Sequence, residues 1–237
     1  MKIPNNLKIN IYSDGADIKT IKKYNNKNFI KGFTTNPTLM KLSGIREYSK
    51  FAKNCLKICK KKSISFEVVT DNLDEMFSQA KIISSWGTNV YVKIPIVNSR
   101  GVSTIPVIKK LIETNIKLNV TAVFTSAQVS KLKKVINKDT NIIISIFAGR
   151  IADTGVDPIN IIKNTVKLFN KNKSVKILWA SPREILNLVH ANNTGCHIIT
   201  LTDSLLKKIE LFGKSHHKYS IETSKMFYDD SKTISFN

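Results

Sequence analysis

The sequence alternates eight times between a short β-branched run and a longer segment with apolar residues three or four apart. The first spacing is typical of a strand and the second of an amphipathic helix. Eight such repeats within 237 residues predict a single-domain α/β fold, a closed (β/α)8 or TIM barrel, with a doubly wound open sheet as the alternative. The predicted strands are Lys8–Asp14, Ile30–Thr34, Ser63–Val69, Asn89–Pro95, Lys117–Val123, Asn141–Phe147, Val175–Ala180 and His197–Leu201.

The domain organisation follows from the absence of a Pro/Gly/Ser-rich linker between these repeats. We expect residues 1–213 to form the barrel domain and residues 214–237 a tail with a helix over Tyr219–Tyr228. Within the barrel, Asp71 is placed to cap the helix after the third strand, and Ser126 the helix after the fifth.

The chain is strongly basic, with 38 Lys and Arg against 17 Asp and Glu, a formal net charge of +21. Clustered basic residues neutralise nucleic-acid phosphates. Here they are spread in ones and twos, and the longest run is Lys60–Lys62. This favours a solvated basic surface over a non-catalytic protein that binds nucleic acid. No apolar run approaches the roughly 20 residues that span a bilayer, so we expect a cytoplasmic protein with no membrane partner.

The three cysteines are an odd number without a secretory context, which predicts reduced thiols. Cys55 and Cys59 lie four residues apart on a predicted helix and could share a metal ion. No histidine or acidic residue accompanies them, so ordinary helix thiols are the favoured interpretation.

The fourth predicted strand, Val-Tyr-Val-Lys-Ile-Pro, contains a single lysine. Val90, Val92 and Ile94 share the face that packs on the helices, so Lys93 points into the barrel near the carboxyl ends of the strands, where catalytic groups lie. The same alternation places further polar residues on the interior face close to strand ends: Asp14, Thr34, Asn36, Glu67, Asn119, Thr121, Ser145 and Ser181.

A lysine in a partly apolar barrel mouth has specific chemistry. Burial disfavours the ammonium and leaves a useful fraction of free amine, which can attack a carbonyl. The resulting Schiff base permits carbon–carbon cleavage through an enamine. The alternative is a buried salt bridge from Lys93 to Glu67 or Asp14, and the strand alone does not separate the two.

The neighbouring polar residues favour catalysis. Asp14 is a suitable general base for a hydroxyl beside the cleaved bond. Glu67 with Thr121 could move protons through water, and the amides of Asn36 and Asn119 suit a polyol substrate. Each residue alone is as well explained by an internal hydrogen bond.

A phosphate site is predicted after the seventh strand. Ser181-Pro182-Arg183-Glu184 reads as a helix start, with proline at the first helical position and a capping-box glutamate. Helix N-termini bind anions, and Arg183 and Arg150 could add planar cationic groups. In the alternative, Ser181 only caps the helix and both arginines are solvated.

Seven motifs follow one another in order over about residues 8–203. They are Tyr12-Ser13-Asp14, Gly32-Phe33-Thr34-Thr35-Asn36-Pro37-Thr38, Ser65-Phe66-Glu67-Val68, Val92-Lys93-Ile94-Pro95, Asn119-Val120-Thr121, Ile144-Ser145-Ile146-Phe147-Ala148-Gly149-Arg150-Ile151 and Ala180-Ser181-Pro182-Arg183. Together they resemble the transaldolases, particularly the small-subunit members related to fructose-6-phosphate aldolase.

The resemblance implies transfer of a dihydroxyacetone unit from a ketose phosphate to an aldose phosphate, with no metal or organic cofactor. It implies that Lys93 forms the imine, that Asp14 is the acid/base, and that Glu67 and Thr121 organise water. The substrate-binding residues it implies are Thr34, with Asn36, Asn119 and Ser145 for the dihydroxyacetone portion, and Arg150, Ser181 and Arg183 for the phosphate.

Some positions separate subgroups of the family, and at two others this chain departs from the usual family residue. Fructose-6-phosphate aldolases carry glutamine and tyrosine where Glu67 and Phe147 stand, which favours a transaldolase over an aldolase that uses free dihydroxyacetone. Family members usually have phenylalanine at Pro182 and proline at Ile146, so the shape of the phosphate pocket and the substrate chain length stay open. In the family such a tail packs over a barrel mouth, often of a neighbouring subunit, and we expect a homo-oligomer.

Overall fold

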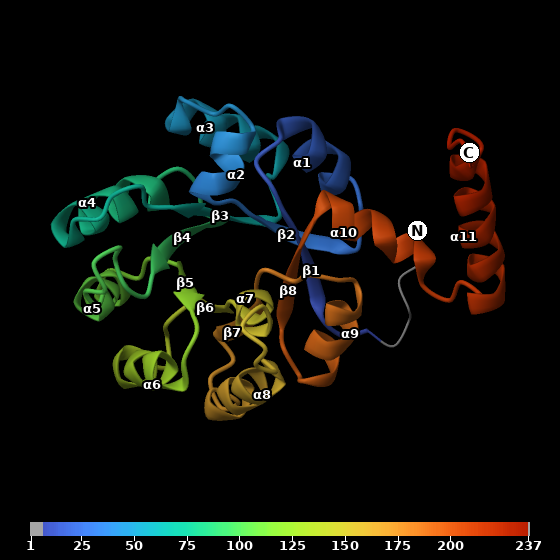
Figure 1. Ribbon diagram of the computed structural model, residues 1–237. Coiled ribbons are helices and arrows are strands. Elements are labelled where there is room, and N and C mark those ends of the chain that lie inside the picture. Colours follow the sequence, from blue (N-terminus) through green and yellow to red (C-terminus); the bar gives the residue numbers. More distant parts are fainter. Residues whose placement is uncertain (1–6, 237) are drawn as a thin grey trace.

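The computed structural model describes residues 7–236, which form a closed barrel of parallel strands surrounded by helices (Figure 1). Each strand pairs with its neighbours in sequence order, and β8 closes the barrel against β1. The predicted (β/α)8 fold is confirmed, and the open-sheet alternative is wrong. The strands are β1 (Asn10–Asp14), β2 (Ile30–Thr34), β3 (Ser63–Glu67), β4 (Val90–Pro95), β5 (Leu118–Val123), β6 (Ile142–Ile146), β7 (Val175–Trp179) and β8 (Ile198–Thr202).

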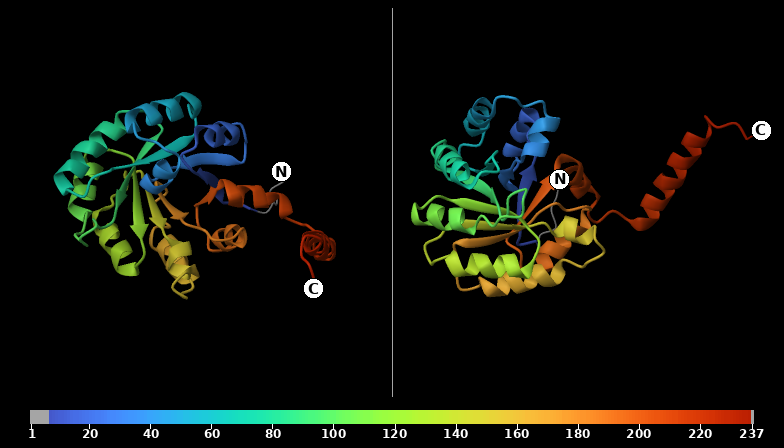
Figure 2. Two further views of the ribbon diagram at one scale, coloured as in Figure 1. Left: turned by 45° about the horizontal axis from the view of Figure 1, so that its top comes forward. Right: turned by 60° about the vertical axis from the view of Figure 1, so that its left-hand side comes forward.

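Helices follow every strand and cover the outside of the barrel (Figure 1). Their bounds are α1 (Ile18–Asn25), α2 (Pro37–Leu42), α3 (Tyr48–Ile58), α4 (Leu73–Ser84), α5 (Ile105–Glu113), α6 (Ser126–Val135), α7 (Ala148–Ala152), α8 (Ile159–Leu168), α9 (Leu186–Asn193), α10 (Asp203–Lys208), the 3-10 helix η1 (Ile209–Leu211) and α11 (His216–Ser231). The last helix, α11, stands away from the barrel (Figure 2) and contains no buried residue.

The barrel wall separates two apolar clusters. The larger lies between strands and helices and includes Val92 and Ile94, as the alternation on β4 predicts. A smaller cluster lies inside the barrel and includes Tyr12. The side chain of Tyr12 points inward, opposite to that of its neighbour Ile11 in the larger cluster. Gly32 on β2 makes room for it, because a Cβ there would lie 2.5 Å from the Tyr12 ring. The remaining inward positions carry buried polar groups, Lys93 among them.

Two predicted helix caps are wrong, each by one residue. Helix α4 is capped by Asn72, because the Asp71 carboxylate instead accepts hydrogen bonds from the backbone and hydroxyl of Ser99. Helix α6 is capped by Thr125 in a capping box, one residue before the predicted Ser126. In both places two adjacent residues can cap. A contact with Ser99 removes Asp71 from that role, whereas at α6 the capping box between Thr125 and Gln128 selects Thr125.

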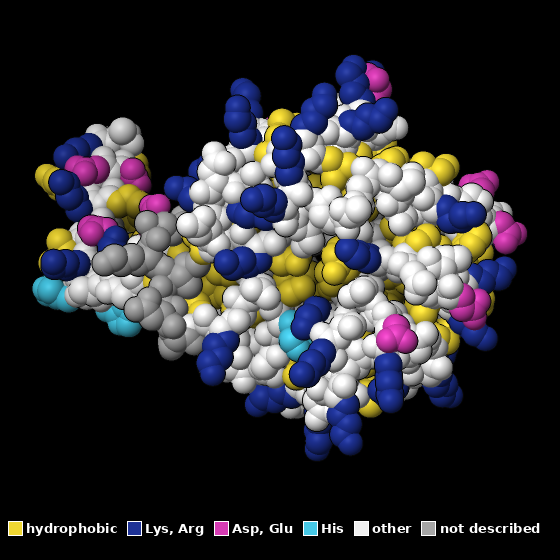
Figure 3. Space-filling view, turned by 180° about the vertical axis from the view of Figure 1, so that it is seen from behind, with side chains coloured by type: hydrophobic (Ala, Val, Ile, Leu, Met, Phe, Trp, Pro, Cys, Tyr) yellow, Lys and Arg dark blue, Asp and Glu magenta, His cyan; other side chains and the backbone are white. Residues whose placement is uncertain are grey.

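The surface agrees with a dispersed positive charge. Lys and Arg side chains are scattered over the face in Figure 3, with uncharged surface between most of them. Among the described residues no helix is long and apolar enough to cross a membrane. The three cysteines are buried and free, and burial raises the pKa of each thiol. Within residues 7–236, no three His, Cys, Asp or Glu side chains gather as metal ligands would.

Candidate active site

A cavity of about 160 Å³ lies at the carboxyl ends of the strands. Every residue that the sequence predicts for substrate binding lines it, as do Lys93, Asp14 and Thr121. Glu67 adjoins the cavity through its contact with Lys93. The complete lining is Asp14, Thr34, Asn36, Lys93, Asn119, Thr121, Ser145, Phe147, Arg150, Ala180, Ser181, Pro182, Arg183 and Thr202.

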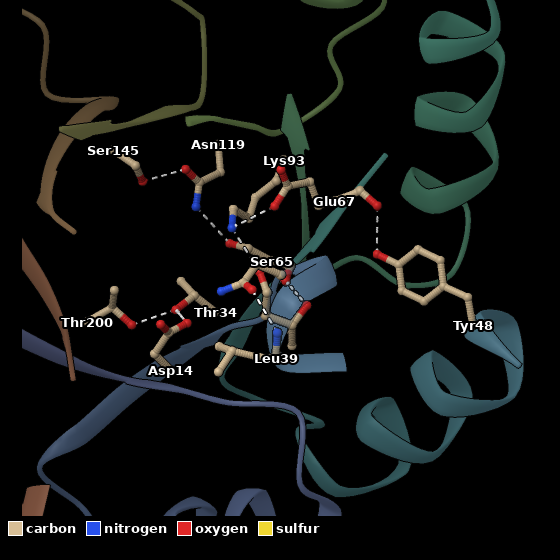
Figure 4. A network of polar contacts seen from close by, with 12 residues as sticks. Asp14, Thr34, Leu39, Tyr48, Ser65, Glu67, Lys93, Asn119, Ser145 and Thr200 are labelled. Carbon is tan, nitrogen blue, oxygen red and sulfur yellow. Dashed lines mark hydrogen bonds and ion pairs between the residues drawn. The ribbon is translucent and has the colours of Figure 1, made fainter. Parts of the chain in front are cut away.

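The Lys93 amine is the most deeply placed cation of the site, with the residue 5% exposed. Its Nζ lies 2.9 Å from Oε2 of Glu67 and donates a hydrogen bond of 2.8 Å to the backbone carbonyl of Thr35 (Figure 4). Carboxylate and carbonyl both stabilise the ammonium. The salt bridge considered from the sequence is therefore present, and it occurs in an amine that also lines the cavity. A nucleophilic role requires the proton to leave first, and Glu67 is the adjacent acceptor.

Asp14 ends β1 beside the same cavity, and Oδ1 accepts a hydrogen bond of 2.6 Å from the Thr34 hydroxyl. Its pKa is raised, first because burial disfavours the carboxylate and also because of the charge of Glu67. The positive charge of Lys93 and the Thr34 hydrogen bond act in the opposite direction. A carboxyl group with a raised pKa is suited to exchanging protons near neutral pH.

The amide of Asn119 is held in one orientation from both sides. Oδ1 accepts a hydrogen bond of 2.6 Å from Ser145, and Nδ2 donates one of 3.0 Å to the Ser65 hydroxyl (Figure 4). Asn36 uses Oδ1 to cap α2 by accepting from the backbone of Leu39, which leaves its Nδ2 for the cavity. Both asparagines therefore combine a fixed position with polar edges that face the same space.

Thr121 differs from its neighbours because its hydroxyl is buried without a hydrogen-bond partner in the described structure. Buried polar groups are usually paired, so an unpaired hydroxyl in a cavity indicates a position for water or a ligand. Thr121 lies within a register shift of β5 between Val120 and Val123, where Ala122 has φ 54°. Bulges of this kind re-aim side chains beside binding sites.

The predicted helix start at Ser181 is wrong. Ser181 adopts a left-handed backbone with φ 58°, and α9 begins only at Leu186. The reason is a close contact with α7, because a Cβ on Gly149 would lie 1.4 Å from the Ser181 carbonyl oxygen. The Asn187 side chain accepts from the backbone of Arg183, which replaces the hydrogen bond of an earlier helix start.

The two arginines at this end have different surroundings. The Arg150 guanidinium lies 5.7 Å from the centre of the Phe147 ring, and no ion pair engages it among the described residues. Arg183 forms a two-pronged ion pair with Asp153, with its Nε 2.9 Å from Oδ1. Arg150 is therefore the freer cation, and Arg183 is the more fixed one.

Several residues of the site were missed by the sequence prediction. Thr200 on β8 contacts the Thr34 hydroxyl, and Ser65 on β3 holds Asn119. The carbonyl of Thr35 binds Lys93. Alternation along β8 already places Thr200 on the inward face, which is a signal that could have found it. A backbone carbonyl leaves no such signal.

A closed parallel barrel with converging polar groups at the carboxyl ends of its strands defines a (β/α)8-barrel enzyme. Residues 11–237 match the family model described as Transaldolase/Fructose-6-phosphate aldolase, and the chain belongs to this family. The family prediction from the seven motifs is thereby confirmed, and the protein belongs with the aldolase and transaldolase enzymes.

Individual relatives agree with this assignment. A protein of Listeria monocytogenes named "Probable transaldolase 2" is 33% identical over 199 residues, which cover 84% of this chain and 87% of that one. A "Probable transaldolase" of Thermoplasma volcanium is 32% identical over 229 residues, 95% of this chain and 96% of that one. The similarity therefore spans nearly whole proteins.

Solved structures share the architecture at much lower identity. KGPDC from Streptococcus mutans has a TM-score of 0.56 and 12% identity, over 84% of this chain and 89% of that one. The structure titled "Native KDPGal structure" has a TM-score of 0.54 and 10% identity, with 85% of each chain covered. At such identities the likeness concerns the fold alone.

Proposed function

We propose that this protein is a transaldolase that moves a dihydroxyacetone unit between sugar phosphates through a Schiff base on Lys93. The observation that carries the proposal is a nearly buried amine at the edge of a polar cavity, with one carboxylate in contact and a second across the site. An isolated lysine with this burial is rare unless it is paired or functional.

The proposed reaction begins with proton transfer from the Lys93 ammonium to Glu67. The free amine adds to the keto carbon of a ketose phosphate, and loss of water gives the imine. Asp14 takes the proton of the C4 hydroxyl, the C3–C4 bond breaks, and its electron pair passes into the protonated imine to give a neutral enamine. The aldose phosphate leaves. The enamine then attacks an acceptor aldehyde, and Asp14 returns its proton to the oxygen of that aldehyde, which becomes the new C4 hydroxyl. Water hydrolyses the new protonated imine to restore the amine.

Glu67 and the unpaired hydroxyl of Thr121 are the groups we assign to the water that leaves and returns. Asn36, Asn119 and Ser145 are assigned to the hydroxyl groups of the dihydroxyacetone portion, with Thr34 beside Asp14. The fixed amide of Asn119 supports this, because a substrate hydroxyl then meets a preorganised partner.

The phosphate group is assigned to Arg150, Ser181 and Arg183, which line one end of the cavity. Two positive side chains favour an anionic substrate, and the net charge of +21 attracts it over longer distances. A helix N-terminus does not contribute to this phosphate site, because α9 begins five residues after Ser181.

Two residues favour transfer over release of free dihydroxyacetone. Glu67 is a carboxylate rather than an amide, and the ring of Phe147 lines the cavity without the hydroxyl of a tyrosine. A phenol would add a proton donor for the enamine, and protonation of the enamine leads to release. We therefore place the activity with the transaldolases proper.

The test is borohydride reduction in the presence of fructose 6-phosphate, followed by mass analysis of peptides. The expected adduct is on Lys93 and is lost in Lys93→Arg. Lys117→Arg is a matched control, because Lys117 directly precedes β5, at the end of the barrel away from the cavity, and donates to the Thr88 carbonyl. Labelling of a different lysine would refute the proposal. Measuring transfer to erythrose 4-phosphate against release of free dihydroxyacetone separates the two activities.

We further propose that residues 214–237 pack on a second copy of this chain. Large apolar side chains of α11, namely Tyr219, Ile221, Met226, Phe227 and Tyr228, are exposed. Exposed apolar residues concentrated on one element are typical of an interface. Light scattering should show an oligomer that Phe227→Glu dissociates and Lys171→Glu, at an exposed barrel position outside the tail, does not. A monomeric wild-type protein would contradict this.

A further inference from the structure

Asp14 is connected to β8 through two hydroxyl groups. Thr34 donates to Oδ1 of Asp14 at 2.6 Å, and its Oγ1 lies 2.5 Å from Oγ1 of Thr200 (Figure 4). Both threonines are buried, at 3% and 5% exposure. Thr200 lies one inward position below the level of Asp14, since β1 and β8 pair Tyr12 with Thr200 and Asp14 with Thr202.

Counting protons shows what this chain of groups can do. A threonine hydroxyl has one proton to donate and two lone pairs to accept with. When Asp14 is a carboxylate, the Thr34 proton is committed to it, so Thr200 must donate to Thr34. When Asp14 is protonated, its proton can point to Thr34, which then donates to Thr200. Rotation of two hydroxyls therefore lets Thr34 remain a hydrogen-bond partner of Asp14 in either protonation state.

We infer that Thr200 is a positioning residue for Asp14, which acts through Thr34 to keep this carboxyl group oriented and paired in both protonation states. The inference rests on the proposed function, in which Asp14 accepts and returns a proton. Thr200 does not line the cavity, and substrate contact is not required of it.

Loss of the Thr200 hydroxyl affects the two states unequally. Hydrogen bonds to a charged acceptor are stronger than neutral ones, and a donor chain reinforces them cooperatively. Removing Thr200 therefore weakens the carboxylate form more than the acid form, and the pKa of Asp14 rises. The charged groups that face Asp14 are Lys93 on β4 and Glu67 on β3, with Arg150 and Arg183 across the cavity. None of them is altered by the substitution.

The experiment is the pH profile of kcat/KM for transfer from fructose 6-phosphate to erythrose 4-phosphate. Thr200→Val should move the acidic limb upward by about 0.4 to 1 pH unit, the equivalent of one hydrogen bond. Thr200→Ser keeps the hydroxyl and should restore the wild-type limb. Thr200→Ala removes the hydroxyl without adding a methyl group and must give the same upward shift, which guards against a folding defect in the valine variant.

A matched control is Thr165→Val on α8, which also loses a buried hydroxyl, one that donates to the Ile161 carbonyl far from the site. The acidic limb of the pH profile of this variant should stay at the wild-type position. An unmoved or lowered limb in Thr200→Val and Thr200→Ala, or no recovery with serine, would overturn the inference. Borohydride trapping separates this failure from that of the proposed function. An adduct on Lys93 with an unmoved limb refutes only the role of Thr200, whereas no adduct in the wild type refutes the Schiff base.

Discussion

The contact between Lys93 and Glu67 allows a quantitative test of the charge state of the site. Nζ and Oε2 are 2.9 Å apart, and the two side chains are 7% and 16% exposed. At an effective dielectric constant of about 20, two unit charges at this separation attract by about 6 kcal/mol, and desolvation of both groups offsets much of this. A net interaction of about 2 kcal/mol is expected for a pair so nearly buried.

Three variants measure that interaction. Lys93→Met keeps an unbranched side chain but removes the charge, and should lower the free energy of unfolding by about 3 kcal/mol because it leaves a nearly buried carboxylate unpaired. Glu67→Gln should cost about 1 to 2 kcal/mol, since its amide oxygen still accepts from the ammonium. The double variant should be about 2 kcal/mol more stable than the sum of the single losses predicts.

Urea unfolding of the four proteins at pH 7 and one protein concentration gives the interaction energy. The control cycle uses Lys50 and Glu47, which are 3.2 Å apart but 70% and 71% exposed, and should give less than about 0.5 kcal/mol. A Lys93–Glu67 interaction no larger than the control would refute the reasoning. The amine would then not be held as an ammonium by Glu67, and the first proton transfer of the proposed mechanism would have no basis.

Two further predictions concern Asp14 and Gly149. Burial raises the pKa of Asp14 in the folded protein. The stability that this group contributes is therefore fully present below its unfolded pKa of about 3.9 and is lost as the pH rises through the folded pKa. Asp14→Asn should therefore have a higher Tm than the wild type at pH 7, by about 2–4 °C for each 1 kcal/mol gained, and lose that advantage near pH 3. Its transfer activity should fall. A lower Tm than the wild type at pH 7 would mean that attraction to Lys93 outweighs burial. In Gly149→Ala the new Cβ would lie 1.4 Å from the Ser181 carbonyl oxygen, so α7 and the segment around Ser181 must move apart. The KM for fructose 6-phosphate should rise at least about tenfold, with trapping on Lys93 retained and about 1–3 kcal/mol of stability lost. Gly15→Ala, whose Cβ would meet nothing within 4 Å, is the control, and an unchanged KM in Gly149→Ala would contradict the assigned phosphate site.

The barrel and the inward direction of Lys93 were predictable because they depend on local periodicity. Strand side chains alternate with a period of two whatever lies beyond the strand, so the burial of Val92 and Ile94 on one face already fixes Lys93 on the other. Family motifs are likewise a property of the linear chain. These features place Lys93, Asp14 and Asn119 at one end of the barrel without reference to any contact between them.

The partners of these groups were settled only in three dimensions. Thr34 and Thr200 are 166 positions apart, and their contact exists because closure of the barrel brings β8 beside β1. Ser181 reads locally as a helix cap, yet the approach of Gly149 places it in a left-handed turn. The sequence by itself therefore determined the fold and most of the polar side chains that face the cavity, because each strand carries that information. The tertiary structure decided what each side chain touches, because hydrogen bonds and close backbone contacts join segments that the sequence holds far apart.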